Sequence, residues 1–121
     1  MKTKLILPCL LLVLSILSGK ADAHAALVSA TPAIDAVVSQ SPPQVALSFS
    51  EDLEPAFCKV EVSDASGQRR DKGDLHLQPG NPRVLVLSLP PLTPADYVVT
   101  WRVTSVDTHK SQGRFGFAVA P

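Results

Sequence analysis

The stretch LTPADYVVTWRVTSV, residues 92–106, decides the fold class of this chain. Its beginning, residues 92–97, has the pattern of a tyrosine corner, in which a tyrosine hydroxyl bonds back to upstream backbone at the edge of a β-sandwich. Residues 97–106 are predicted to form the longest strand of the chain, with Trp101 as the tryptophan of the core. The stretch therefore predicts a β-sandwich and gives Tyr97 a structural role.

Short apolar runs separated by Pro, Gly, Ser and Asp continue on both sides of this stretch, and no window holds a helical period for long. That pattern is typical of an all-β protein. We predict strands at residues 26–30, 45–49, 57–63, 83–89, 97–106 and 113–119, with a further short strand at 75–77. About seven strands at this spacing predict an immunoglobulin-like Greek-key sandwich.

The first residues have the form of a secretory signal peptide. Lys2 and Lys4 precede a mostly apolar run at residues 5–17, and Ala21-Asp22-Ala23 has the small-x-small form that signal peptidase recognises. We therefore expect a signal peptide at residues 1–23, cleaved after Ala23, and one domain at residues 24–121. An uncleaved membrane anchor is the alternative, but a span needs about 20 apolar residues.

The charged residues exclude a nucleic-acid partner. The chain has 11 Lys and Arg against 11 Asp and Glu, and losing the leader makes the balance slightly acidic. Arg69, Arg70 and Lys72 cluster, but aspartates flank them, which is typical of a solvated loop rather than a basic binding face.

The mature chain cannot form an internal disulfide, because only one of the two cysteines remains after the leader is removed. Cys9 lies in the leader, so Cys58 is the single cysteine of residues 24–121. We expect Cys58 to pack as a small hydrophobic residue, because a reactive thiol needs an exposed, electropositive setting. The alternative is a copper(I) or redox role.

Three residues could hold a metal ion. Cleavage after Ala23 would make His24 the first residue, with both its α-amine and its imidazole available as donors. Asp107 and His109 stand two positions apart and would share one face if the strand continues there. Nitrogen and oxygen donors of this kind suit tetragonal copper(II). The alternative is a surface aspartate near a surface histidine.

Several segments carry a resemblance to a known family. They are residues 24–27, 29–32, 47–51 and 101–109, followed by Gly113. In this combination the chain resembles the CopC family of periplasmic copper-binding, copper resistance proteins. The resemblance covers nearly all of residues 24–121.

The resemblance implies a cupredoxin-like β-sandwich with a copper(II) site made by His24, Asp107 and His109. It also implies that Glu51 lies close to this site and supports it, although a solvated carboxylate at a strand end is the alternative. One branch of the family adds a methionine-rich loop for copper(I). Here Met1 is the single methionine, so we expect a copper(II)-only protein, with His76 as an exposed histidine.

The leading hypothesis is a periplasmic protein, not an enzyme, that buffers or carries copper(II) for copper homeostasis or resistance. We expect a monomer whose partner is an inner-membrane copper permease of the CopD type. One alternative is a histidine-brace copper oxidase or monooxygenase. Another is a metal-free interaction domain, which would apply if His24 is not the first residue of the mature chain.

Overall fold

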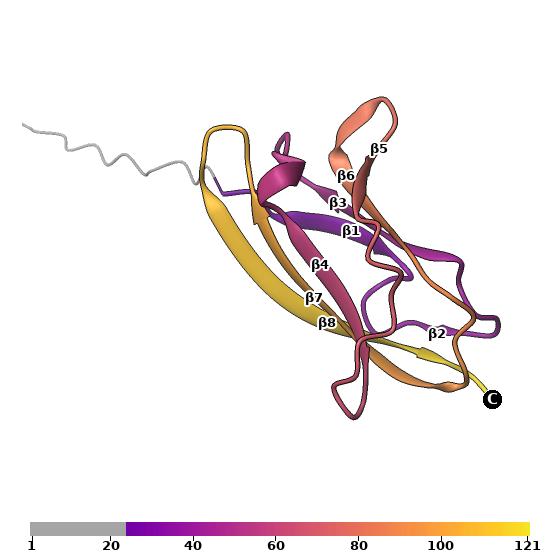
Figure 1. Ribbon diagram of the computed structural model, residues 1–121. Coiled ribbons are helices and arrows are strands. Elements are labelled where there is room, and N and C mark those ends of the chain that lie inside the picture. Colours follow the sequence, from indigo (N-terminus) through magenta and orange to yellow (C-terminus); the bar gives the residue numbers. More distant parts are fainter. Residues whose placement is uncertain (1–23) are drawn as a thin grey trace, which may run out of the picture.

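Two four-stranded sheets pack face to face in the computed structural model, which describes residues 24–121 (Figure 1). The first sheet has the order β1 (Leu27–Thr31), β3 (Gln44–Phe49), β6 (Asn81–Ser88) and β5 (His76–Gln78). The second has the order β2 (Val37–Val38), β8 (Lys110–Val119), β7 (Ala95–Thr104) and β4 (Lys59–Asp64). The expected all-β sandwich is confirmed.

The only helical element of residues 24–121 is a 3₁₀ turn, η1 (Pro55–Phe57), ahead of β4. Within that range no helix has the length and apolar character of a membrane span. The predicted signal peptide at residues 1–23 lies outside the described residues.

Residues 24–121 form eight strands rather than about seven. The additional strand is β2, two residues that pair in parallel with Ala118 and Val119 of β8. Two residues cannot show an alternation, so this strand could not be predicted from local pattern. At β2 the chain crosses to the second sheet before it returns to the first at β3.

Alternating apolar residues from the two sheets fill the space between them. Inward positions along β3 and β4 are buried while their neighbours are partly exposed, as strand geometry requires. Both faces of β6 are buried at residues 84–87. Each buried Val, Leu or Phe contributes about 1.5–3 kcal/mol relative to an exposed one.

Trp101 and Tyr97 take their predicted places in this core. Trp101 packs edge-on against Phe49, with ring centroids 5.1 Å apart. The Tyr97 hydroxyl donates to the carbonyl oxygen of Thr93 at 2.6 Å, which confirms the tyrosine corner. The Tyr97 ring stacks on Phe117.

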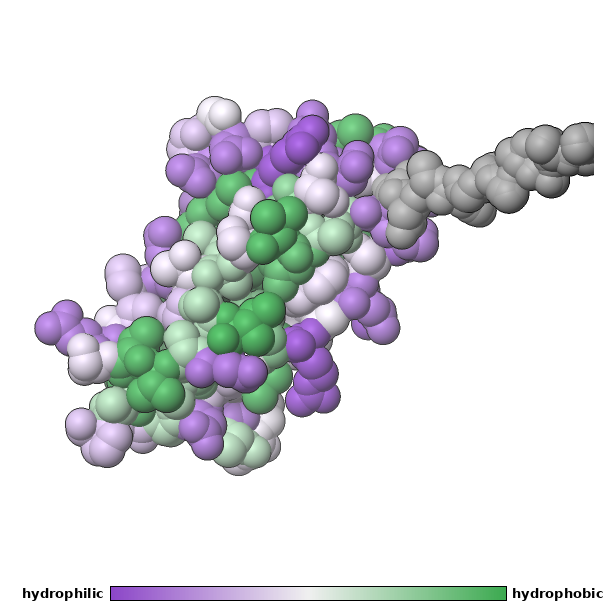
Figure 2. Space-filling model, turned by 180° about the vertical axis from the view of Figure 1, so that it is seen from behind, coloured by the Kyte–Doolittle hydropathy of each residue, from purple (hydrophilic) through white to green (hydrophobic). Residues whose placement is uncertain are grey.

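Some large apolar side chains stay at the surface of the described chain. Seen from behind, the molecule carries separate apolar patches among polar residues (Figure 2). The exposed large hydrophobic residues are Val28, Ile34, Val37, Phe57 and Val106. Phe57 is the last residue of η1, and Val106 lies in the turn between β7 and β8.

Candidate metal centre

The turn between β7 and β8 carries two of the three predicted ligands. The last antiparallel pair of the hairpin is Thr104 and Lys110. Beyond it, the Ser105 N–H donates to the His109 carbonyl oxygen at 2.9 Å, and the Thr108 N–H donates to the Ser105 carbonyl oxygen at 2.8 Å. Thr108 adopts a φ of 73°, a left-handed conformation that is unusual for a β-branched residue.

The prediction that Asp107 and His109 share one strand face was wrong. The strand ends at Thr104 and not at Val106, so both residues lie in the turn. Pairing stops there because the chain must reverse direction within a few residues to form β8. The turn, rather than the two-residue period of a strand, brings the two side chains together.

Asp107 and His109 lie side by side in this turn. His109 Nδ1 is 3.3 Å from Asp107 Oδ1, and about half of each side chain is exposed. The buried Ser105 also donates its hydroxyl to Asp107 Oδ1. The Ser105 hydroxyl, and after it His109, hold the pKa of Asp107 below its ordinary value. Asp107 is therefore ionised at neutral pH and able to attract a cation.

The described chain begins next to this turn, at the end of the sandwich away from the C-terminus (Figure 1). His24 is the first described residue. Its ring centroid is 5.5 Å from that of His109, with the two ring planes tilted by 56°. The following residue, Ala25, is buried, and Ala26 forms a backbone hydrogen bond with Ser50. The structure thus places His24 and Asp107 each beside His109.

Glu51 follows Ser50 in the bend after β3 and is partly exposed. Within residues 24–121, the structure gives it no hydrogen bond or ion pair with Asp107 or His109. Its supporting role at the site stays a prediction.

The donor types fit copper(II), although the ligand set is incomplete in this arrangement. Within residues 24–121, no three His, Cys, Asp or Glu side chains are arranged to hold a metal ion. His109 contacts both other candidates, but they are not gathered around one point. In the uncut chain the His24 nitrogen is an amide, which is a poor ligand. Two imidazoles and a carboxylate are nevertheless donors that copper(II) accepts.

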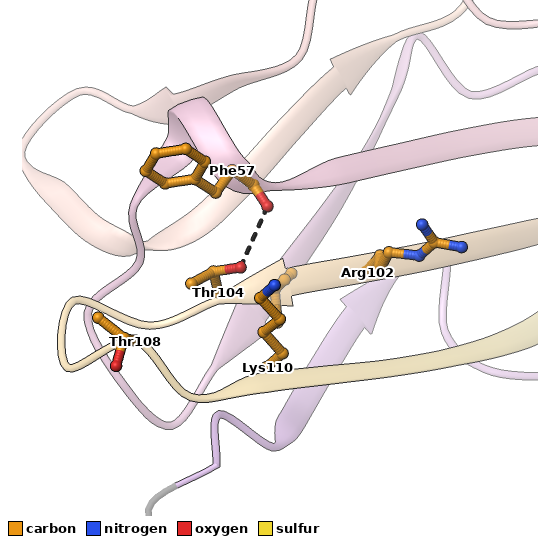
Figure 3. Close-up of a pocket in the computed structure, with 6 residues that line it drawn as sticks. Phe57, Arg102, Thr104, Thr108 and Lys110 are labelled. Atoms are coloured by element: carbon orange, nitrogen blue, oxygen red, sulfur yellow. Dashed lines mark hydrogen bonds between the residues drawn. The ribbon is translucent and has the colours of Figure 1, made fainter.

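A cavity of about 380 Å³ lies beside the turn and was not predicted from the sequence (Figure 3). It is lined by Phe57, Arg102, Val103, Thr104, Thr108 and Lys110. The Thr104 hydroxyl donates to the carbonyl oxygen of Phe57 at 3.2 Å and so ties η1 to β7 at the cavity wall. Phe57 is distant in sequence from the other lining residues, which lie within residues 102–110, so no local pattern indicates the cavity.

Cys58 and His76 lie as predicted. Cys58 is partly buried against the core, and its thiol donates to the carbonyl oxygens of Glu54 at 3.3 Å and Thr104 at 3.8 Å. Burial, more than any other cause, raises the pKa of this thiol, so it is a poor thiolate ligand. His76 is exposed on β5, with Nδ1 2.7 Å from the carbonyl oxygen of Asp74.

Comparison with known proteins assigns the chain to a family. Residues 27–120 match the CopC domain. Protein YobA of Escherichia coli strain K12 is 30% identical over 110 residues, which cover 90% of this chain and 89% of YobA. Copper resistance protein C of Pseudomonas syringae pv. tomato is 31% identical, and the alignment covers 86% of each chain.

A solved structure agrees with this assignment. The crystal structure of CopC from Methylosinus trichosporium OB3b superposes with a TM-score of 0.72 at 37% sequence identity, covering 81% of this chain and 95% of that one. A domain match over nearly all described residues, together with a shared fold at this identity, leaves one conclusion. This chain belongs to the CopC family.

Proposed function

We propose that this protein binds copper(II) in the periplasm and buffers or carries it for copper homeostasis or resistance. The observation that carries the proposal is that His109 lies beside both His24 and Asp107 at one end of the sandwich. The name copper resistance protein C, borne by a relative of similar length, supports a role with copper. The copper ion is cargo in this proposal.

The proposal includes maturation after Ala23. Cleavage there turns the His24 amide into an amine, so that one residue offers two nitrogen donors that can close a chelate ring. Together with Asp107 and His109 this makes four donors of the nitrogen and oxygen kind. Residues 1–23 would then be the signal peptide and residues 24–121 the copper-binding domain.

We assign the protein no catalytic step. A histidine-brace oxidase or monooxygenase needs an open position on its copper, and here Asp107 lies beside His109 where it would fill that position. We propose instead a monomeric carrier that exchanges copper with an inner-membrane permease of the CopD type.

The test is a copper(II) competition titration on exported protein whose first residue has been verified as His24 by intact mass. We expect one copper(II) per chain and a strong loss of affinity in His109→Ala. The matched control is His76→Ala, which removes an exposed histidine from a different strand and should bind normally. Unchanged binding by the His109 variant would contradict the proposal.

A further inference from the structure

Two serine side chains attach the segment that carries His24 to the sandwich. The Ser111 hydroxyl donates to the carbonyl oxygen of Ala25 at 2.6 Å. The Ala26 N–H donates to the Ser50 hydroxyl oxygen at 2.8 Å, and the Ser50 N–H donates to the Ala26 carbonyl oxygen at 2.9 Å. Ala25 is only 1% exposed. The backbone next to His24 is therefore fixed before the first strand begins.

Of these two serines, Ser111 lies at the beginning of β8, directly after the turn that carries Asp107 and His109. It lies two positions after His109 and pairs with Val103 across the β7–β8 hairpin. Its hydroxyl bond to Ala25 therefore joins the segment that carries His24 to the segment that carries His109. The two segments come from opposite ends of the described chain, so this short bond restricts how far their histidines can separate.

We propose that Ser111 is a positioning residue of the copper(II) site, which acts by holding Ala25 so that His24 stands against His109. This inference rests on the proposed function. Two ligands on separate segments must be ordered before they can share one ion, and a segment that is already fixed loses less entropy on binding. Without the hydroxyl, the carbonyl oxygen of the buried Ala25 would lose this hydrogen-bond donor. The segment would then lose its attachment to β8.

The experiment compares Ser111→Val with Ser111→Thr in exported protein that begins at His24. Both substitutions introduce a branched side chain that suits a strand, but only threonine keeps a hydroxyl. We expect Ser111→Val to weaken copper(II) binding about 10- to 100-fold in a competition titration, the usual cost of removing a group that supports a metal ligand. Ser111→Thr should stay near the unsubstituted protein. Ser63→Ala, on β4 away from the turn, is the control serine.

A double-mutant cycle separates positioning from a general effect on the fold. If Ser111 acts through His24, Ser111→Val should cost almost nothing in a His24→Ala background. The nitrogen hyperfine pattern in electron paramagnetic resonance should also change in Ser111→Val and return in Ser111→Thr.

Three outcomes would count against the inference. Equal affinity of Ser111→Val and the unsubstituted protein would overturn it, and so would an equal loss with and without His24. If the unsubstituted protein itself binds no copper(II), the proposed function fails and this inference fails with it. Chemical denaturation of each metal-free variant shows whether it is folded, and the threonine variant remains as the test if valine is not tolerated.

Discussion

The imidazole rings of His24 and His109 lie with their centroids 5.5 Å apart, although the two residues come from opposite ends of the described chain. His24 precedes β1 of one sheet, and His109 precedes β8 of the other. The candidate site therefore lies where the two layers meet at one end of the sandwich. An ion bound by both rings would connect the layers.

The first prediction concerns the chain terminus. One additional alanine before His24 should weaken copper(II) binding by roughly tenfold or more, because it turns the terminal amine back into an amide and leaves the imidazole in place. The measurement is a competition titration of the extended and the correctly cut proteins. Equal affinities would show that the amine is not a ligand.

The second prediction concerns the stability that the metal confers. Copper(II) at 100 times its dissociation constant should raise the free energy of unfolding by about 2.7 kcal/mol, because it binds the folded state and holds both sheets. Thermal unfolding with and without copper(II) measures this. The gain should largely vanish in His24→Ala, and an equal gain in that variant would place the ion elsewhere.

The third prediction concerns Asp71, whose side chain is fully buried beside the edge strand β4. It accepts hydrogen bonds from the Arg69 guanidinium and from the N–H groups of Val62 and Gly73. Burial alone would raise the pKa of Asp71. The hydrogen bonds from Arg69, Val62 and Gly73 together lower the pKa by more than burial raises it, so it lies below its ordinary value of 3.8.

A lowered pKa in the folded state makes stability depend on pH in one direction. The contribution of Asp71 is fully present above about pH 4 and is lost as the pH falls through the lower, folded-state pKa. Asp71→Asn should cost about 1–3 kcal/mol at neutral pH, because buried donors lose a charged acceptor. Denaturant titrations should show this difference shrinking on acidification. A stability difference that does not change with pH would contradict a stabilising role for the ionised Asp71. The control is Asp96→Asn, which changes an exposed aspartate.

The fourth prediction concerns Gly113, which lies against the indole of Trp101. A Cβ at Gly113 would stand 2.6 Å from Cζ2 of that ring, closer than real contacts allow. Gly113→Ala would gain about 0.4–1 kcal/mol by restricting the unfolded chain. Overpacking a rigid aromatic ring costs about 1–3 kcal/mol, so the substitution should destabilise. Denaturation followed by tryptophan fluorescence measures this, with exposed Gln112→Ala as control. Unchanged stability would mean that the ring can move aside.

Local pattern was enough to predict most of the fold. The core role of Trp101 and the corner at Tyr97 follow from short-range sequence, and the structure places both as expected. The parallel strand β2 could not be predicted, because its two residues are defined by a partner at the other end of the chain. The sequence pattern also predicted that this strand would run to Val106, whereas β7 ends at Thr104. Neither Ser105 nor Val106 is a glycine or proline, the residues that signal a turn most strongly.

The candidate site was predictable in its residue types but not in its geometry. His24, Asp107 and His109 could be named from spacing and from the cleavage pattern. The bond from Ser111 to Ala25 is a tertiary contact between segments far apart in the sequence. The turn contains Thr108 in a left-handed conformation that is unusual for a β-branched residue. No periodicity in the sequence encodes them.

The last prediction is redox selectivity. The candidate ligands are nitrogen and oxygen donors, which favour copper(II), whereas copper(I) prefers thioether and thiolate sulfur. The single methionine is Met1, and the thiol of Cys58 is partly buried, with a pKa that burial raises. We therefore expect no intense blue thiolate band and little retention of copper after reduction with ascorbate. Cys58→Ser should leave copper(II) binding nearly intact, while His109→Ala should impair it. Tight copper(I) binding that disappears in Cys58→Ser would move the functional centre from the chain terminus to the thiol.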